Sequence, residues 1–246
     1  MRRITIVTIA LGLLLPAAVA AQDQQPGITR DQADAILNEL RQIRQLLEKQ
    51  AKPSAPAPQD AEGAVKLKIG DANWLGNKDA PITMVEFTDY QCTFCQRFHT
   101  VTFPEIRKQF IDTGKVRFLS RDFPLDFHAN AFRAAEAARC AGEQGQYWKM
   151  RDLLVADPSR LSQEDLVGKA EKLGLKMDPF KACLTGGKYR QAVQKDMAEA
   201  ASLNVSGTPT FIIGKSTPDG VDGVFLVGAH PFESFQQKLK DFGIVK

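Results

Sequence analysis

Two cysteines, Cys92 and Cys95, have the residue type and spacing for reversible sulfur chemistry. They follow a β-rich apolar run and stand at the start of a helical pattern. Free N–H groups and the positive end of a helix dipole stabilise a thiolate there, so we expect Cys92 to be the nucleophile. Cys95, one turn into the helix, could then attack a mixed disulfide formed on Cys92. Thr93 and Phe94, between them, are expected to contact the molecule that supplies the other sulfur.

The same spacing also occurs in metal sites and in structural disulfides. The chain has no second CxxC pair to complete a four-cysteine zinc site, and His99 adds one ligand only. A site made of Cys92, Cys95 and His99 would suit a soft ion such as Cu(I). Two hypotheses are therefore open, disulfide exchange and non-enzymatic Cu(I) binding. We expect the first, without a metal or cofactor, and with His99 at the surface or behind the cysteines.

Glu86 is a carboxylate in an otherwise apolar run, six residues before Cys92. Burial of a carboxylate costs free energy unless the group has a partner or a catalytic task. We expect Glu86 to lie behind the active helix and to accept or return the proton of Cys95, directly or through water. The alternative is a glutamate that faces solvent on a half-exposed strand.

Thr208 and Pro209 stand directly before a second β-rich run that starts at Thr210. Proline is tolerated at the first residue of a strand, and a cis Thr208–Pro209 bond would explain its presence there. We expect this loop to face Cys92, which would leave the Thr208 backbone free to pair with an extended substrate chain. An ordinary trans turn is the alternative.

Cys140 and Cys183 both fall in a helical part of the chain. Four cysteines allow three pairings. The short spacing favours Cys92 with Cys95, which leaves Cys140 to pair with Cys183. We expect a structural disulfide there, and the alternative is a pair of buried free thiols.

The chain's size and charge limit its organisation and partners. Its 246 residues are 43% hydrophobic, which is enough for one main core with extensions. The formal net charge of +3 includes Arg2 and Arg3. So balanced a charge gives no indication of nucleic-acid binding.

Residues 1–20 have the pattern of an export signal. Arg2 and Arg3 precede the apolar run Ile4–Leu15, and Ala18-Val19-Ala20 matches a cleavage site. We predict cleavage after about Ala20 and export to the periplasm, an oxidising compartment in which disulfides persist. A membrane anchor is the alternative, but the apolar run of 12 residues is shorter than the roughly 20 that span a bilayer.

Residues 21–64 contain a predicted helix and a linker. Thr29 and Gln32 form a capping-box pattern that opens a helix to about residue 50. Its apolar residues recur at spacings of three and four: Ala33, Ile36, Leu40, Ile43 and Leu47. Residues 51–64, rich in proline and alanine, predict an extended linker. Either the helix packs on its own domain, or residues 29–50 form a homo-oligomer; the linker favours the oligomer.

Residues 65–246 predict an α/β domain with a helical insertion at about 128–204. The expected order is a strand at 82–88, a helix at 92–111, a strand at 116–121, five helices, two strands and a final helix. The helices are expected at 131–141, 146–155, from 162, from 178 and at 189–203, the last strands at 210–213 and 224–227, and the final helix at 231–242.

Residues 65–246 resemble the DsbA-like branch of the thioredoxin superfamily. Four segments carry the resemblance: Val85–Cys95, Phe118–Leu125, Cys140–Trp148 and Gly207–Phe211. It implies a thioredoxin fold with an all-helical insertion and a cis-proline loop beside the CxxC pair. It also implies that Cys92 is the nucleophile, Cys95 the resolving cysteine, Glu86 a buried carboxylate and Pro209 cis.

The resemblance implies an exported thiol:disulfide oxidoreductase that acts on client proteins with a membrane redox partner similar to DsbB or DsbD. Where the best-known oxidase of the family has Pro-His between its cysteines, this chain has Thr93-Phe94. Thr208 before the proline is more similar to the oligomeric isomerases of the family. We expect oxidation of clients slightly ahead of isomerisation.

Overall fold

The computed structural model describes residues 29–50, 63–70 and 73–244. The chain divides into two units, Met1–Ala55 and Pro56–Lys246, which are described separately. The predicted export signal, residues 1–20, lies outside the described residues, as does most of the predicted linker, residues 51–62.

In the first unit, helix α1 (Arg30–Gln50) occupies the range expected from the sequence. The Thr29 N–H donates to Gln32 Oε1 at 3.0 Å, and the Gln32 N–H donates to Thr29 Oγ1 at 3.3 Å, so the capping box is formed. Four large apolar side chains of α1 are about half exposed: Ile36, Leu37, Leu40 and Ile43. Within the described residues, no helix has the length and apolar character to cross a membrane.

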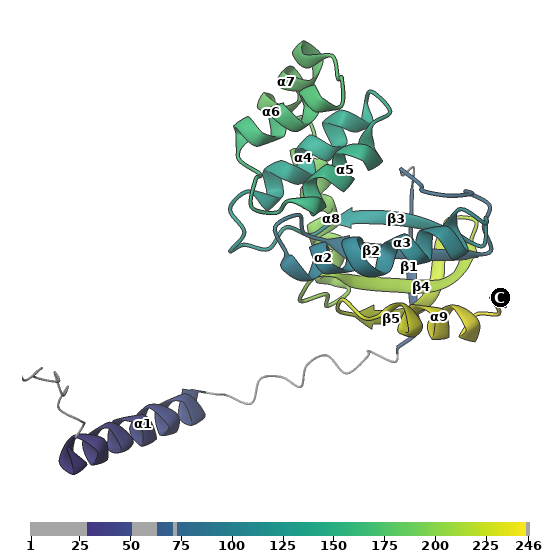
Figure 1. The fold of residues 1–246 in the computed structure, drawn as a ribbon. Helices are drawn as coiled ribbons and strands as arrows, with labels where there is room; N and C mark the ends of the chain where they lie inside the picture. The colour runs from purple at the N-terminus through teal and green to yellow at the C-terminus, as the bar shows by residue number, and fades with distance from the viewer. Residues whose placement is uncertain (1–28, 51–62, 71–72, 245–246) are drawn as a thin grey trace, which may run out of the picture. The chain divides into compact units, whose positions relative to one another are not determined.

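The second unit is built on a five-stranded sheet with the order β1-β5-β4-β2-β3 (Figure 1). β2 and β3 are parallel, and the other neighbouring pairs are antiparallel. β2 lies between β3 and β4, and each of its residues is buried, which explains its nearly continuous apolar sequence. The strands are β1 (Val65–Lys68), β2 (Ile82–Thr88), β3 (Val116–Asp122), β4 (Thr210–Thr217) and β5 (Gly220–Val227).

The segment after β2 is helical from Thr93 to Ile111, close to the single helix predicted. It consists of α2 (Thr93–Arg97) and α3 (Phe103–Ile106), each followed by one π-helical turn, at Phe98–Thr102 and Arg107–Ile111. Pro104 has no N–H to bond the Thr100 carbonyl, and the Phe103 N–H reaches back five residues to the Phe98 carbonyl. The missing donor therefore accounts for the first π-helical turn.

Five helices lie between β3 and β4, as the sequence predicts. They are α4 (Ala131–Gly142), α5 (Tyr147–Ala156), α6 (Gln163–Lys172), α7 (Met177–Thr185) and α8 (Arg190–Ser202). Figure 1 shows α4 to α7 grouped together to one side of the sheet. They enclose a core of their own, which includes Met150, Leu166 and Phe180. A disulfide between Cys140 on α4 and Cys183 on α7 joins two of these helices, with their Cα atoms 5.9 Å apart.

The two faces of the sheet have separate cores. One core lies between the sheet, the helical segment 93–111 and α9 (Phe232–Asp241), and it contains Phe98, Phe211 and Phe235. The core on the other face contains Val85, Phe87 and Ala200 of α8. The element order therefore confirms the predicted fold class, a thioredoxin fold interrupted by a helical insertion. Only β1 was not predicted, because four residues alternating buried and exposed are too short to distinguish from a loop.

Candidate active site

Cys92 occupies the N-cap position of α2 and has extended backbone geometry. Its side chain is 6% exposed, and its Sγ lies 3.3 Å from the Thr208 carbonyl oxygen, to which the thiol donates. Cys95 is fully buried one turn further along. Both are free thiols in this structure, so the site is in the dithiol form.

The environment of Cys92 favours its thiolate. A hydrogen bond from Cys95 is the largest effect, and together with donors from Thr208 and the N–H groups of Cys95 and Phe94 it outweighs burial and lowers the pKa of Cys92 to about 6. The Thr208 hydroxyl is buried without another hydrogen-bond partner, so it is available to the ionised sulfur. Cys92 is therefore largely ionised at neutral pH.

The environment of Cys95 instead favours its protonated thiol. Burial, the hydrogen bond with Cys92 and the negative charge of Glu86 raise the pKa of Cys95 well above its usual value of 9.0. The two sulfurs of one CxxC pair therefore hold different protonation states, with the proton on the inner sulfur. The asymmetry suits Cys92 to attack or to leave as a thiolate, and it suits Cys95 to act as the resolving sulfur.

The loop before β4 lies against Cys92. The Thr208–Pro209 peptide bond is cis, and it places the Thr208 carbonyl beside the sulfur. Two hydrogen bonds hold the loop: Thr210 Oγ1 donates to the Gly207 carbonyl at 2.7 Å, and the Gly228 N–H donates to the Pro209 carbonyl at 2.8 Å. Thr93 and Phe94 are exposed on the first turn of α2, where a bound chain can reach them.

Glu86 is fully buried in the middle of β2, so the alternative of a solvent-facing glutamate is wrong. Nε2 of His99 lies 2.8 and 2.9 Å from its two carboxylate oxygens, and Nη2 of Arg151 donates to Oε2. Burial raises the pKa of Glu86, but the hydrogen bond from His99 and the positive charge of Arg151 together lower it by more, so the net shift of the pKa is downward. Glu86 is therefore a buried anion.

Arg151 of α5 is the cation that compensates Glu86, and the sequence analysis missed it. Its side chain is fully buried, its Nε donates to Ser120 Oγ at 3.0 Å, and its Nη1 donates to His99 Nδ1 at 3.2 Å. Its spacing in the sequence indicates burial, because Arg151 stands four residues after Tyr147 and three before Leu154, on the buried face of the helix. The helical insertion thus supplies a charge to the centre of the sheet.

His99 is buried between Glu86 and Arg151, so of its two expected positions, at the surface or behind the cysteines, the surface position is wrong. Burial and the charge of Arg151 lower the pKa of His99 to about 4, so the ring is neutral, with Nε2–H donating to Glu86. Both ring nitrogens are occupied. Across the described residues, no group of three His, Cys, Asp or Glu side chains could hold a metal. His99 is thus turned toward Glu86 and Arg151, so this arrangement does not present it with Cys92 and Cys95 as a third ligand for Cu(I).

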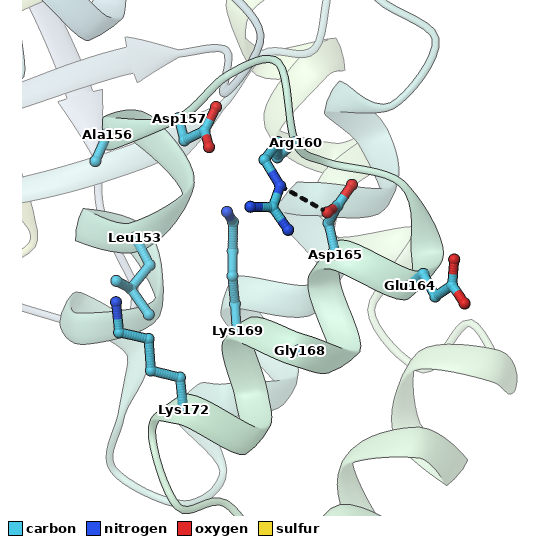
Figure 2. Close-up of a pocket in the computed structure, with 9 residues that line it drawn as sticks. All are labelled: Leu153, Ala156, Asp157, Arg160, Glu164, Asp165, Gly168, Lys169 and Lys172. Carbon is cyan, nitrogen blue, oxygen red and sulfur yellow. Dashed lines mark hydrogen bonds and ion pairs between the residues drawn. The ribbon is translucent and has the colours of Figure 1, made fainter.

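A pocket of about 520 Å³ lies in the helical insertion, between α5 and α6 (Figure 2). Acidic and basic side chains line it, among them Asp157, Lys169 and Lys172, and Arg160 Nε donates to Asp165 Oδ1 at 3.1 Å. None of the exchange-site residues lines this pocket, so it adds nothing to the sulfur chemistry.

The chain is similar in sequence to several known proteins. A family model described as thioredoxin matches residues 68–224. The chain is 35% identical over 161 residues to the Na(+)/H(+) antiporter NhaA 3 of Salinispora tropica, covering 65% of this chain and 24% of that protein. It is 32% identical over 148 residues to disulfide bond formation protein D of Bacillus subtilis, covering 56% of this chain and 66% of that protein. The chain thus spans about a quarter of the length of its antiporter relatives.

Among solved structures, the crystal structure of α-DsbA1 from Wolbachia pipientis is similar to this chain. The two share 26% sequence identity and superpose with a TM-score of 0.63, covering 72% of this chain and 92% of that one. The similarity therefore extends over both the sheet and the helical insertion.

Proposed function

Because the chain belongs to the thioredoxin family, in its DsbA-like branch, we propose that it is an exported thiol:disulfide oxidoreductase that acts on client proteins through Cys92 and Cys95. The observation that carries the proposal is the asymmetric pair of sulfurs, one with a pKa of about 6 at a helix N-terminus and one buried and protonated. Disulfide exchange needs this asymmetry.

In the oxidising direction the Cys92–Cys95 disulfide is the starting state. A client thiolate attacks Cys92 Sγ, the S–S bond breaks, and Cys95 leaves with the electron pair and takes up a proton. A second client thiolate attacks the client sulfur of the mixed disulfide and expels Cys92 as a thiolate. The client loses two electrons and gains a disulfide, and the protein gains the same two electrons as a dithiol.

We propose oxidation of clients ahead of isomerisation. A sulfur with a low pKa leaves readily, and a stabilised thiolate favours the reduced protein, which makes its disulfide the stronger oxidant. Glu86 is the proposed partner for the proton of Cys95, since its charge acts on that thiol. Isomerisation uses the same groups in the reverse order, with reduced Cys92 attacking a wrong disulfide.

The remaining parts of the proposal concern location and assembly. Residues 1–20 direct export to the periplasm and are removed after about Ala20. A membrane protein similar to DsbB or DsbD restores the redox state of the cysteine pair. The exposed apolar face of α1, with Ile36, Leu40 and Ile43, joins copies of the chain into a homo-oligomer.

The direction of exchange is tested by the reduction potential of the Cys92–Cys95 pair, measured by equilibration with glutathione buffers. A potential near the oxidising end of the thioredoxin-to-DsbA range, close to about −120 mV, supports an oxidase. Reduced ribonuclease should then gain disulfides, and scrambled ribonuclease should recover activity more slowly. A potential near that of thioredoxin, about −270 mV, would contradict the oxidase assignment.

The assembly proposal is tested by removing residues 22–58. Light scattering of the mature chain should give a multiple of the monomer mass, and the shortened chain should give the monomer mass. Replacing Ile36, Leu40 and Ile43 together by Ser is the milder version of the same test. An unchanged mass in both variants excludes α1 as the oligomer contact.

A further inference from the structure

We propose that the cavity between α5 and α6 is a binding site for a phosphate ester that carries hydroxyl groups, such as a glycerol phosphate. The cavity has a volume of about 520 Å³, which is within the range of small-molecule sites in proteins. Both helices belong to the helical insertion, and binding there is independent of the exchange at Cys92. Figure 2 shows the side chains that line the cavity.

A tight turn after α5 places a carboxylate and a guanidinium at one end of the cavity. The turn has the sequence Asp157-Pro158-Ser159-Arg160, with aspartate first and proline second, the residues that type I turns favour at these positions. The Arg160 N–H donates to the Asp157 carbonyl at 3.3 Å and closes the turn. Both charged side chains line the cavity.

The guanidinium of Arg160 is held in place and still has donors left. Its Nε donates to Asp165 Oδ1 at 3.1 Å. Asp165 is fixed in turn, because its Oδ2 accepts the Ser162 N–H at 3.2 Å and the Ser162 hydroxyl at 2.6 Å. The two terminal nitrogens of Arg160 make no hydrogen bond within the described part of the chain. Paired N–H groups of a guanidinium match the oxygens of a phosphate, so this side chain can bind one.

Lys169 and Lys172 face the same cavity from α6. They stand three residues apart and so lie on one side of the helix. Figure 2 shows Lys169 directed toward the Arg160 guanidinium, and Lys172 at the other end of the cavity, on the side of Leu153. Neither ammonium group makes an ion pair or a hydrogen bond with another described residue. The cavity therefore contains two ammonium groups that are available to an anion.

The positive charge of Lys169 is only partly compensated by the protein. Burial lowers the pKa of Lys169, and the positive charges of Arg160 and Lys172 add to that effect. Asp157 and Asp165 act in the opposite direction, but the net shift of the pKa is downward. A phosphate between Lys169 and Arg160 would gain two cationic partners and would relieve the repulsion between them.

The acidic side chains of the lining leave space for the phosphate and favour a hydroxyl beside it. Figure 2 shows the Glu164 carboxylate turned away from Lys169 and the cavity. Asp157 Oδ1 accepts the Ser159 hydroxyl at 2.7 Å, and Asp157 Oδ2 accepts no hydrogen bond from a described residue. That oxygen can accept from a hydroxyl of the ligand, so a phosphate ester of a polyol fits the cavity better than inorganic phosphate does.

Gly168 leaves the wall of the cavity open. It stands three residues after Asp165 and four before Lys172, on the same side of α6. Glycine inside a helix destabilises it relative to alanine, and a Cβ at this position would meet no atom within 4 Å. The packing of the protein therefore gives no steric reason for this glycine, whereas a ligand that lies against the helix does.

The proposal is tested by titrating the full chain with glycerol-3-phosphate at constant ionic strength, followed by NMR. The amide resonances of Gly168 and Lys169 should shift and saturate. Glycerol should cause no shift, and inorganic phosphate should bind more weakly, because each offers only part of the interactions. Lys169→Met should weaken the binding of glycerol-3-phosphate about tenfold, the factor expected for loss of one charge-assisted hydrogen bond.

Two further variants serve as controls. Lys195→Met makes the same change of charge on α8, outside the cavity, and should retain the parent affinity. Gly168→Leu should raise the midpoint of urea unfolding, since leucine favours a helix, and should remove the saturable shift of Lys169, since its side chain fills the cavity. A residue with a structural role alone would not change these two properties in opposite directions. Parent affinity in Lys169→Met or in Gly168→Leu overturns the proposal.

A last pair of measurements identifies the source of the phosphate ester. Vesicles of phosphatidylglycerol display a glycerol phosphate group, and sedimentation with them that is lost in Lys169→Met indicates a lipid headgroup. Saturable binding of glycerol-3-phosphate without such sedimentation indicates a soluble ester. Absence of both from the parent chain shows that the cavity is not a phosphate-ester site.

Discussion

The two cysteine pairs of this protein occupy opposite kinds of position. Cys92 is at the N-terminus of a helix, next to free N–H groups and a loop carbonyl, and its partner is in the first turn of the same helix. Cys140 and Cys183 lie within two different helices, α4 and α7, and form a disulfide between them. The first pair joins residues of one helix end, and the second holds two helices together.

This difference shows that a cysteine at the end of a helix is suited to react, whereas a disulfide between two helices is suited to stabilise the fold. At a helix end, unpaired donors stabilise a thiolate. Inside a packed helical core, a sulfur has no such donors, and opening the bond would free two helices. The comparison leads to four predictions.

The largest expected effect is that of Cys92→Ser on exchange. Without the nucleophile, the rate of disulfide transfer to reduced ribonuclease should fall to that of the blank, because a hydroxyl cannot form the mixed disulfide. Cys95→Ser should instead accumulate the mixed disulfide, visible by non-reducing electrophoresis. Measurable exchange in Cys92→Ser would place the reactive sulfur elsewhere.

The next largest effect is expected for Arg151 of α5, whose positive charge pairs with Glu86 of β2. Arg151→Met leaves Glu86 buried without its cation, and the free energy of unfolding should fall by about 3–5 kcal/mol. The double variant Glu86→Gln/Arg151→Met should recover most of that loss, because no uncompensated charge is left. Urea unfolding measures both. Equal stability of the single and double variants would contradict the pairing.

A somewhat smaller loss is expected for Cys140→Ala/Cys183→Ala. The disulfide closes a segment with a sequence separation of 43, and its removal should cost about 2–5 kcal/mol in urea unfolding. The exchange rate at low denaturant should stay at the parent value, since neither sulfur lies at the reactive site. A matching loss of exchange would show that the two pairs depend on each other.

The smallest effect is a pH dependence. Thiolate absorbance of the reduced protein should rise with a midpoint near pH 6, from Cys92 alone. The folded pKa lies below the unfolded value of 9.0, so ionised Cys92 stabilises the reduced protein fully above about pH 9. That contribution declines as the pH falls and is absent below about pH 6. A single midpoint near pH 9 would remove the basis for Cys92 as the nucleophile.

The parts of the fold that were predicted correctly depend on local patterns. β2 has the predicted bounds, Ile82–Thr88, because its apolar β-branched run fits a central strand. Helix α6 follows Ser162, where the sequence predicts a helix start, and Ser162 and Asp165 form both hydrogen bonds of a capping box. Cys92 stands at a helix start because the strand before it and the helical pattern after it meet there.

Other features could not be inferred locally. Arg151 is 65 residues from Glu86 in sequence, and its role depends on α5 packing against β2. The pairing of Asp89 with His128 depends in the same way on a loop that returns to the residues before Cys92. For His99 the sequence left a surface and an interior position open, because helical spacing gives the direction of a side chain and not the element that covers it.

The sequence by itself determined where elements start and end, and with them the position of the reactive sulfur, since capping groups, prolines and apolar spacing act over a few residues. Only the tertiary structure decided which charges meet in the interior. A buried ion is tolerated only with its partner, and here the partners of Glu86 come from α5 and from the π-helical turn after α2. Burial depends on packing between distant segments, which no local pattern contains.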